Sequence, residues 1–205
     1  MNRLNALMRF IQERTELGEY LKADEYIDLS DASIQQKAKD LFVPLSEEEK
    51  IRAAYEFVRD EIRHSRDIDS NVVAVRASDT LRYKEGICLS KSLLLAALLR
   101  CGGIPAGLCY QRLTSDDTDT GYIIHGLNAV FLTTKNKWVR LDARGNRPGV
   151  DAQFSVDEER IAFPVRAECG ETDLRTIYAR PPSAIMEAWA RCKSPRDYCF
   201  DTDRL

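Results

Sequence analysis

One cysteine, one histidine and one aspartate occupy positions at which a cysteine nucleophile could be activated. Cys88 begins a strongly apolar segment directly after Gly86-Ile87, and we predict that it lies in the first turn of a helix. The free N–H groups and positive dipole end of a helix N-terminus lower the pKa of a thiol from its ordinary value of about 8.5. A thiolate nucleophile also needs a base, and the base needs a carboxylate to orient it. We predict His125 and Asp142 for these two roles, and we expect Gly86 to let a substrate backbone approach closely.

The register of one β-hairpin decides whether His125 and Asp142 can meet. We expect two strands around a turn at 134–137, and strand side chains alternate between the two faces of a sheet. A turn centred between residues 133 and 134 would place the two side chains directly opposite each other. A turn centred one residue later would make them diagonal neighbours, with Cβ atoms about 7–8 Å apart. A three-residue loop would place them on opposite faces.

The spacing of apolar residues predicts the elements that carry these side chains. A capping box at Ser46–Glu49 indicates a helix start. The helix from Cys88 is apolar almost all round, which predicts a central, covered position, and Gly102-Gly103 ends it. The expected helices span 2–14, 31–42, 46–64, 78–83, 88–101 and 182–192. The expected strands span 106–113, 125–133, 138–142 and 161–166.

This order of elements predicts an α+β fold, in which N-terminal helices and a central cysteine-bearing helix pack on an antiparallel sheet. A length of 205 residues favours one domain. We divide it into an N-terminal helical extension (1–45), a catalytic core (46–145) and a C-terminal strand and helix extension (146–205).

Composition excludes several classes of function. The chain has 30 Lys and Arg against 33 Asp and Glu, a formal net charge of -3, so no broad basic face for nucleic acid is expected. The longest apolar run, Leu93 to Leu99, has seven residues, far fewer than the ~20 that span a bilayer. The N-terminal residues include no apolar signal segment, so we expect a cytoplasmic protein with reduced thiols. Two histidines, and six cysteines without a C-x-x-C pair, predict neither a metal site nor a cofactor.

Several motifs occur in a characteristic order along residues 46–145. Gly86-Ile87-Cys88 precedes the apolar helix and a Gly-Ile-Pro-Ala turn, His125 opens a strand, and a WVRLD segment ends at Asp142. This stretch resembles the core of the transglutaminase-like superfamily, in its branch of small bacterial cytosolic members. The resemblance implies a papain-like α+β fold in which Cys88 is the nucleophile, His125 the base and acid, and Asp142 the residue that orients the imidazole. It also implies acyl transfer from an amide or peptide bond of a peptide, protein or small amide substrate, through a thioester.

Four other residues have a structural and a functional interpretation. Tyr83 lies five residues before Cys88 and is a candidate oxyanion donor or a packing residue. Trp138 is expected to pack on the hairpin, with a pocket role as the alternative. Arg144, like Arg140, is expected to pair with Asp142 or to bind a substrate carboxylate.

His64, at the end of a predicted helix, is interpreted as structural because an imidazolium suits the helix dipole there.

Two other classes of function compete with a cysteine acyl-transfer enzyme. The first is a catalytically inactive transglutaminase-like module that binds a peptide or a protein, and an intact Cys88, His125 and Asp142 set argues against it. The second is a redox or metal protein that uses the six cysteines, and the missing ligand spacing argues against it. Reactivity of the Cys88 thiol toward amides distinguishes a cysteine acyl-transfer enzyme from both of these competitors.

Overall fold

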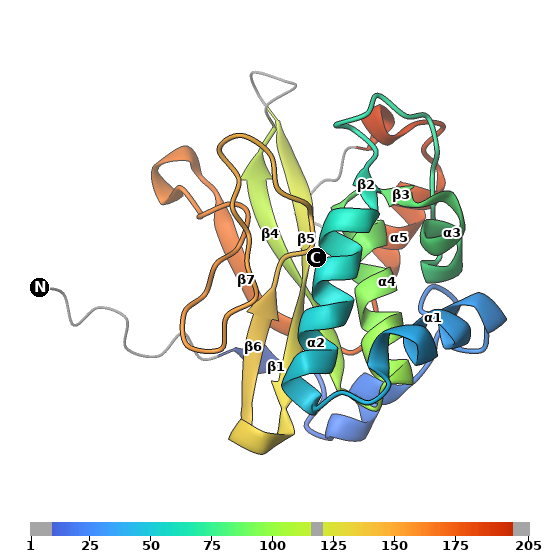
Figure 1. The fold of residues 1–205 in the computed structure, drawn as a ribbon. Helices are drawn as coiled ribbons and strands as arrows, with labels where there is room; N and C mark the ends of the chain where they lie inside the picture. Colours follow the sequence, from blue (N-terminus) through green and yellow to red (C-terminus); the bar gives the residue numbers. More distant parts are fainter. Residues whose placement is uncertain (1–9, 116–120, 199–205) are drawn as a thin grey trace, which may run out of the picture.

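A five-stranded sheet and a layer of helices on one of its faces form the molecule (Figure 1). The computed structural model describes residues 10–115 and 121–198. The strand order is β1-β7-β4-β5-β6; β1 runs parallel to β7, and the other neighbouring strands are antiparallel. The α+β prediction is therefore confirmed.

The helices are α1 (Ala32–Phe42), α2 (Glu47–Glu56), α3 (Ala77–Tyr83), α4 (Cys88–Cys101) and α5 (Ser183–Ala190). The strands of the large sheet are β1 (Ile11–Gln12), β4 (Ala106–Thr114), β5 (Tyr122–Leu132), β6 (Lys137–Leu141) and β7 (Thr172–Tyr178). A separate pair of short parallel strands is formed by β2 (Arg63–His64) and β3 (Glu85–Gly86). None of the helices within the described ranges has the length and apolarity that crossing a bilayer would need.

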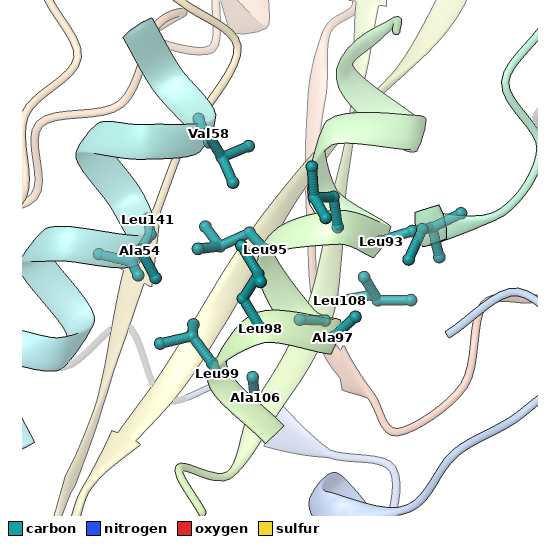
Figure 2. Close-up of a cluster of buried hydrophobic side chains, with 14 of the residues drawn as sticks. Ala54, Val58, Leu93, Leu95, Ala97, Leu98, Leu99, Ala106, Leu108 and Leu141 are labelled. Atoms are coloured by element: carbon teal, nitrogen blue, oxygen red, sulfur yellow. The ribbon is translucent and has the colours of Figure 1, made fainter. Parts of the chain in front are cut away.

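Helix α4 is the centre of the core, as its sequence predicts. Every residue from Cys88 to Arg100 is buried. Figure 2 shows leucines of α4 packed between α2 and the sheet, with Leu141 of β6 beside Ala54 of α2, and Leu108 of β4 beside Ala97 of α4. Burial on all sides fixes the position of the helix N-terminus, and with it the position of Cys88.

The helices around α4 begin where capping residues predict. The Asp31 carboxylate accepts hydrogen bonds from two backbone N–H groups of the first turn of α1. The backbone N–H and hydroxyl of Ser46 donate to the Glu49 carboxylate at 2.8 and 2.6 Å, so Glu49 reaches back as in a capping box. Helix α2 widens into a π-helical turn, Phe57–Glu61, and ends before the predicted residue 64. The chain then becomes strand β2.

Two predicted elements differ from the structure, and one observed strand was not predicted. Residues 2–9 of the helix expected at 2–14 lie outside the described residues, and Ile11–Gln12 form β1, because they pair in parallel with β7. The segment 161–166 is irregular and pairs with no strand among the described residues. Strand β7 was not predicted, because polar residues interrupt its apolar pattern and most of it is only half-buried.

The smaller differences concern element ends. Helix α3 begins at Ala77, one residue before its predicted cap at Ser78, and Asp79 at its third position accepts a hydrogen bond from the backbone N–H of Arg76. Helix α5 spans eight residues within the expected 182–192, with Pro182 at its start.

The β5–β6 hairpin has the second of the three arrangements considered, in which His125 and Asp142 are diagonal neighbours. Asn128 is paired with Leu141, and Val130 with Val139. A 3₁₀ turn at Thr133–Lys135 is closed by Asn136, whose φ of 50° is a left-handed conformation that asparagine tolerates. Asp142 follows one residue after β6.

Candidate active site

The Cys88 thiol lies at the N-terminus of α4, where strand β5 passes close to the helix. The backbone N–H of Gly126 donates to Cys88 Sγ at 3.4 Å. A Cβ atom on Gly126 would lie 2.8 Å from Leu89 Cδ2 and 3.2 Å from Leu89 Cα, so only glycine permits this approach. The side chain of Cys88 is 9 % exposed, and it borders a cavity of about 430 Å³.

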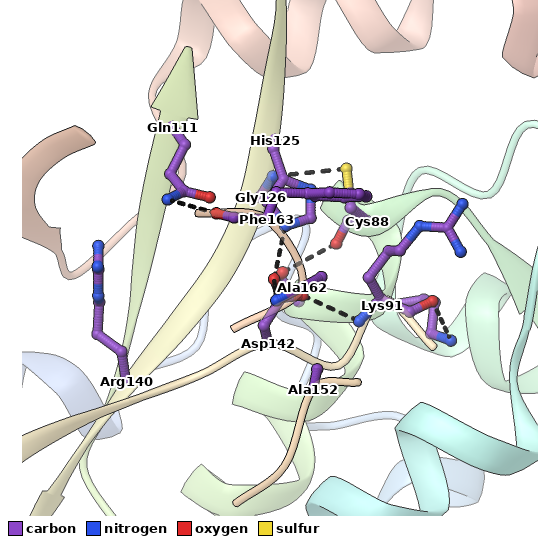
Figure 3. A network of polar contacts seen from close by, with 12 residues as sticks. Cys88, Lys91, Gln111, His125, Gly126, Arg140, Asp142, Ala152, Ala162 and Phe163 are labelled. Carbon is purple, nitrogen blue, oxygen red and sulfur yellow. Dashed lines mark hydrogen bonds and ion pairs between the residues drawn. The ribbon is translucent and has the colours of Figure 1, made fainter. Parts of the chain in front are cut away.

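His125 and Asp142 meet beside this thiol (Figure 3). His125 Nε2 and Asp142 Oδ2 are 2.8 Å apart, and both side chains are buried. The Asp142 carboxylate also accepts the backbone N–H groups of Ala162 at 2.9 Å and Arg144 at 3.1 Å. Because three donors converge on it, the carboxylate has a fixed orientation and in turn fixes the imidazole ring. His125 and Asp142 are diagonal neighbours in the observed hairpin register, and their side chains are close enough to form a hydrogen bond.

Electrostatics favour a charged pair between the thiol and the imidazole. Burial alone would raise the pKa of Cys88, but the charge of His125 and hydrogen bonding from His125 and His64 hold that pKa well below its usual value. Burial opposes protonation of His125, but the charges of Asp142 and Cys88 raise its pKa to about 10. Burial likewise disfavours the charged form of Asp142, and the His125 charge outweighs it and lowers the pKa of the carboxyl. The site therefore favours a thiolate beside an imidazolium at neutral pH.

The cavity in front of Cys88 has apolar walls and a charged rim. Its charged lining consists of Arg66, Asp67, Arg144, Arg147, Arg166 and Glu171. Its apolar lining includes Ile87, Leu113, Ile123, Ala162, Phe163 and Pro164. A cavity that exposes a nucleophile between apolar walls and a few polar groups is typical of a small-molecule or peptide-binding site.

Arg144 lines the cavity but does not pair with Asp142 through its side chain. Its guanidinium donates to both carboxylate oxygens of Asp67, at 2.6 and 2.7 Å. Arg140 is also paired elsewhere, with Glu159 and Asp173. The expectation that either guanidinium pairs with Asp142 is therefore wrong, because each has a bidentate carboxylate partner of its own.

Tyr83 and Trp138 lie outside the cavity lining. The side chain of Tyr83 is 44 % exposed, and its hydroxyl accepts a hydrogen bond from Arg82 at 2.8 Å, so this geometry does not support Tyr83 as an oxyanion donor. The Trp138 ring packs edge-on against Tyr20 and Phe131, with centroids 4.9 and 5.5 Å away. Trp138 is therefore a packing residue.

Gly86 has a different purpose from the predicted one. A Cβ atom on Gly86 would lie 2.7 Å from Ser90 Cβ and 3.2 Å from Thr80 Cγ2. The space beside this glycine is filled by α3 and α4, so it permits close packing around the start of α4 rather than the approach of a substrate.

His64 is part of the site, which corrects its purely structural interpretation. His64 is buried, borders the same cavity as Cys88, and contributes to the lowered pKa of the Cys88 thiol. The sequence prediction missed this because it continued α2 to residue 64. The π-helical turn ends the helix early, and pairing of His64 with Gly86 then brings the ring to the cysteine.

The segment predicted as a strand at 161–166 instead supports the histidine. The N–H of Ala162 bonds the Asp142 carboxylate, and the Phe163 ring stands edge-on to His125 with centroids 5.1 Å apart. Gln111, opposite His125 in the sheet, donates to the Phe163 carbonyl at 3.4 Å. The 161–166 segment therefore contacts Asp142 and His125 instead of pairing with a strand.

Lys91, one turn after Cys88, anchors the chain around the site. Its buried Nζ donates to the carbonyl oxygens of Arg59, Ile62 and Arg144, at 3.2, 2.5 and 2.9 Å. It thereby links α4 to the π-helical turn that follows α2 and to Arg144, two residues after Asp142. A lysine inside a mostly apolar, buried helix was the sequence signal for this role.

Cys88, Cys101, Cys109 and Cys169 are free thiols, and Cys199 lies outside the described residues. In the same described ranges, no three His, Cys, Asp or Glu side chains are grouped so as to hold a metal ion.

Two solved structures are similar to this chain. No curated protein matches the sequence. A candidate cysteine protease from Cytophaga hutchinsonii is similar in structure, with 18 % identity and a TM-score of 0.49, over 64 % of this chain and 43 % of that one. A TGase is similar with 16 % identity and a TM-score of 0.43, over 61 % of this chain and 33 % of that one. The chain thus spans less than half the length of either structure.

The family comparison covers the elements that build the site. The model of the transglutaminase-like superfamily matches residues 34–143, which is just over half of the chain. The match runs from α1 to the residue after Asp142, and so includes Cys88 and His125. This chain is a member of the transglutaminase-like superfamily.

Proposed function

We propose that the chain is a cysteine-dependent acyl-transfer enzyme that acts on amide or peptide bonds through a thioester. One observation carries the proposal: a thiol at the start of a buried helix lies beside an imidazole that is 2.8 Å from a buried carboxylate. Cys88, His125 and Asp142 are the nucleophile, the acid and base, and the orienting group. Membership in the transglutaminase-like superfamily supports this assignment.

Acylation begins with attack of the Cys88 thiolate on the carbonyl carbon of the substrate. A C–S bond forms and the carbonyl π electrons move to oxygen, which becomes an oxyanion. The N–H of Cys88 is available to stabilise it, because the first N–H groups of a helix have no carbonyl partner within the helix. His125 then gives its proton to the leaving nitrogen, the C–N bond breaks, and a thioester remains.

Deacylation uses the same groups in the reverse direction. His125, now neutral, takes a proton from water or from an amine as that nucleophile attacks the thioester carbon. The C–S bond breaks, and the thiolate–imidazolium pair is restored. Water gives hydrolysis, as in a peptidase or amidase, and an amine gives transfer, as in a transglutaminase.

A panel of peptide amides and esters, offered with and without a primary amine, tests the proposal. We expect the wild type to release product from some of them, and Cys88→Ala to release none. Cys169→Ala is the matched control, because this exposed cysteine does not line the cavity. Equal turnover by Cys88→Ala would contradict the proposal, and peptide binding without any thioester would favour a binding module.

A further inference from the structure

Arg147 lines the same cavity as Cys88, and the acyl-transfer steps described above give it no role. Its Nη1 lies 3.9 Å from Asp67 Oδ1, which is too long for a hydrogen bond. No other side-chain ion pair or hydrogen bond joins this guanidinium to a described residue. The side chain is 44 % exposed, so its donors are open to a ligand that enters the cavity.

The carboxylate nearest to Arg147 is already used by a second arginine. Both oxygens of Asp67 accept hydrogen bonds from Arg144, at 2.6 and 2.7 Å. Burial would raise the pKa of Asp67, but the hydrogen bonds and charge of Arg144 hold it below its ordinary value, so the group is ionised at neutral pH. One negative charge therefore lies beside two guanidiniums, and it neutralises Arg144 first. A positive charge remains on Arg147 at the cavity.

The backbone that carries Arg147 is fixed in a tight turn. The N–H of Val150 donates to the Arg147 carbonyl at 2.8 Å, and the N–H of Arg147 donates back at 3.3 Å. Pro148-Gly149 occupy the centre of the turn, where Gly149 has the positive φ of 83° that a type II turn requires. The Asn146 side chain closes the base of the loop through two hydrogen bonds with the backbone of Ala152. Such a turn presents a guanidinium with little ordering cost when a ligand binds.

The other carboxylate of the described cavity lining does not oppose a negative ligand. Glu171 Oε1 accepts a hydrogen bond from Arg166 Nη2 at 2.6 Å, so Glu171 is ion-paired as Asp67 is. The walls beside these groups are apolar and include Ile123 and Phe163, and low polarity strengthens an ion pair. A guanidinium presents parallel N–H donors that match the two oxygens of a carboxylate. A carboxylate is therefore the group that Arg147 suits best.

We propose, on the basis of the function inferred above, that the enzyme acts on amide or peptide substrates that carry a carboxylate near the reacting bond, and that Arg147 binds this carboxylate. Arg147 is then the specificity-determining residue of the cavity. Arg144 was the candidate from sequence for binding a substrate carboxylate, but Asp67 occupies its guanidinium. The carboxylate belongs either to the C-terminal end of a peptide or to an acidic side chain, and the two share this chemistry.

Matched alkylating probes test this recognition without requiring turnover. The Cys88 thiolate attacks the CH₂ of an iodoacetyl group, a C–S bond forms, and iodide leaves. N-iodoacetylglycine and its amide differ only in having a carboxylate or a neutral amide at the chain end. The α-amides of N-iodoacetylglutamic acid and N-iodoacetylglutamine place the same difference on a side chain. Each rate is divided by that of the same probe with 2-mercaptoethanol, and peptide mapping confirms that Cys88 is the residue modified.

Three variants separate recognition by Arg147 from a general effect of charge. Arg147→Gln removes the positive charge, and Arg147→Lys keeps it without the paired donors. Arg82→Gln is the matched control, because exposed Arg82 also has one carboxylate partner, Asp79, but does not line this cavity. All three changes are at partly exposed side chains, so the variants should fold.

We expect wild-type Cys88 to prefer the carboxylate member of at least one probe pair by about 5-fold. Arg147→Gln should reduce this preference to within about 2-fold of unity, Arg147→Lys should keep part of it, and Arg82→Gln should keep all of it. Rates with the neutral probes should be unchanged within about 2-fold. A preference confined to the glycine pair identifies a chain end as the source of the carboxylate, and one confined to the glutamic acid pair identifies a side chain.

Three results would overturn this inference: no preference in the wild type, an undiminished preference in Arg147→Gln, or equal slowing of charged and neutral probes in that variant. Failure of the proposed function is recognised separately. If Cys88 reacts with none of the probes, the activated thiolate does not exist, and both proposals fall together. If the preference is present but Cys88 forms no thioester with any acyl substrate, acyl transfer is refused while Arg147 remains a carboxylate-binding residue.

Discussion

His125 and Asp142 are 17 residues apart in the sequence, yet His125 Nε2 and Asp142 Oδ2 are separated by 2.8 Å. The contact depends on the register of the β5–β6 hairpin, in which Asn128 is paired with Leu141. A shift of one residue in this pairing would turn one of the two side chains to the other face of the sheet. The turn at Thr133–Lys135 is therefore as necessary to the site as the residues themselves.

Asp142→Asn should keep the fold and lose most of the activity. All three groups that contact the carboxylate are N–H donors, so an amide NH₂ must face one of them. We expect a loss of about 1–3 kcal/mol in the free energy of unfolding. Turnover should fall about 10–10³-fold, because Asn holds the ring but does not stabilise the imidazolium.

Asp173→Asn is the control for this change, because Asp173 also pairs with a buried cation, Arg140, but does not line the main cavity. It should affect stability and leave turnover nearly intact. Thermal melts of both variants accompany the assays. If Asp142→Asn turned over substrate as fast as the wild type, Asp142 would not be needed for catalysis, and only Cys88 and His125 would remain as catalytic residues.

Cys88 should be the first cysteine to react with limiting iodoacetamide at neutral pH. Exposure alone predicts Cys169, which is the exposed cysteine of those described. The neighbouring imidazoles lower the pKa of Cys88, whereas burial raises the pKa of Cys109 to about 12 and also raises that of Cys101. Peptide mapping identifies the modified residue. Dominant labelling of Cys169 or Cys192 would show that no activated thiolate exists at Cys88.

The two reactions of Cys88 should differ in their alkaline limits. Alkylation needs only the thiolate, so its rate should reach a plateau well below the free thiol pKa of about 8.5 and stay there. Amide turnover also needs protonated His125 as an acid, and the pKa of His125 is raised to about 10. Turnover should therefore fall above pH 10 while alkylation persists.

Removing the Asp142 charge should move this alkaline limit to lower pH, because that charge raises the pKa of His125. Rates measured from pH 4 to 11 in wild type and Asp142→Asn provide the comparison. Parallel loss of alkylation and turnover above pH 10 would be inconsistent with separate roles for the thiolate and the acid.

Gly126→Ala should damage the site by separating β5 from α4. The new methyl group would meet Leu89 Cδ2 at 2.8 Å and the backbone of the same residue at 3.2 Å. Overpacking of this kind costs about 1–3 kcal/mol, and the shift moves His125 relative to Cys88. We expect turnover to fall more than 10-fold. Gly18→Ala is the control, because no atom lies within 4 Å of a Cβ at Gly18. Equal effects of the two changes would show that close approach at Gly126 is unimportant.

Much of the fold was predictable because local patterns agree with the tertiary structure. The helix at Cys88–Cys101 is apolar all round and is in fact central, and the capping residues Asp31 and Ser46 begin helices. Alternating residues and a turn predicted the β5–β6 hairpin, but only the structure chose between the two registers. These elements together bring Cys88, His125 and Asp142 into one place.

The parts that were missed depend on contacts between distant segments. Helix α2 ends early at a π-helical turn, so no periodicity argument could place His64 next to Cys88. The Ala162–Phe163 segment has a strand-like composition, but the Ala162 N–H donates to Asp142 and the Phe163 ring packs on His125, and the segment pairs with no described strand. Tyr83 is close to Cys88 in sequence, but its exposed side chain does not reach the cavity. Proximity in sequence was a poor guide for these side chains.

Capture of the thioester on Cys88 tests the central claim most directly. Wild-type protein is mixed with p-nitrophenyl acetate, quenched in acid, and analysed by intact mass and by peptide mapping, with Cys88→Ala and Cys169→Ala in parallel. The account predicts one acetyl group on Cys88 in the wild type and in Cys169→Ala, its removal by hydroxylamine as expected of a thioester, and no rapid acetylation of Cys88→Ala. Acetylation that is absent from Cys88, or that is equally rapid in Cys88→Ala, would contradict it.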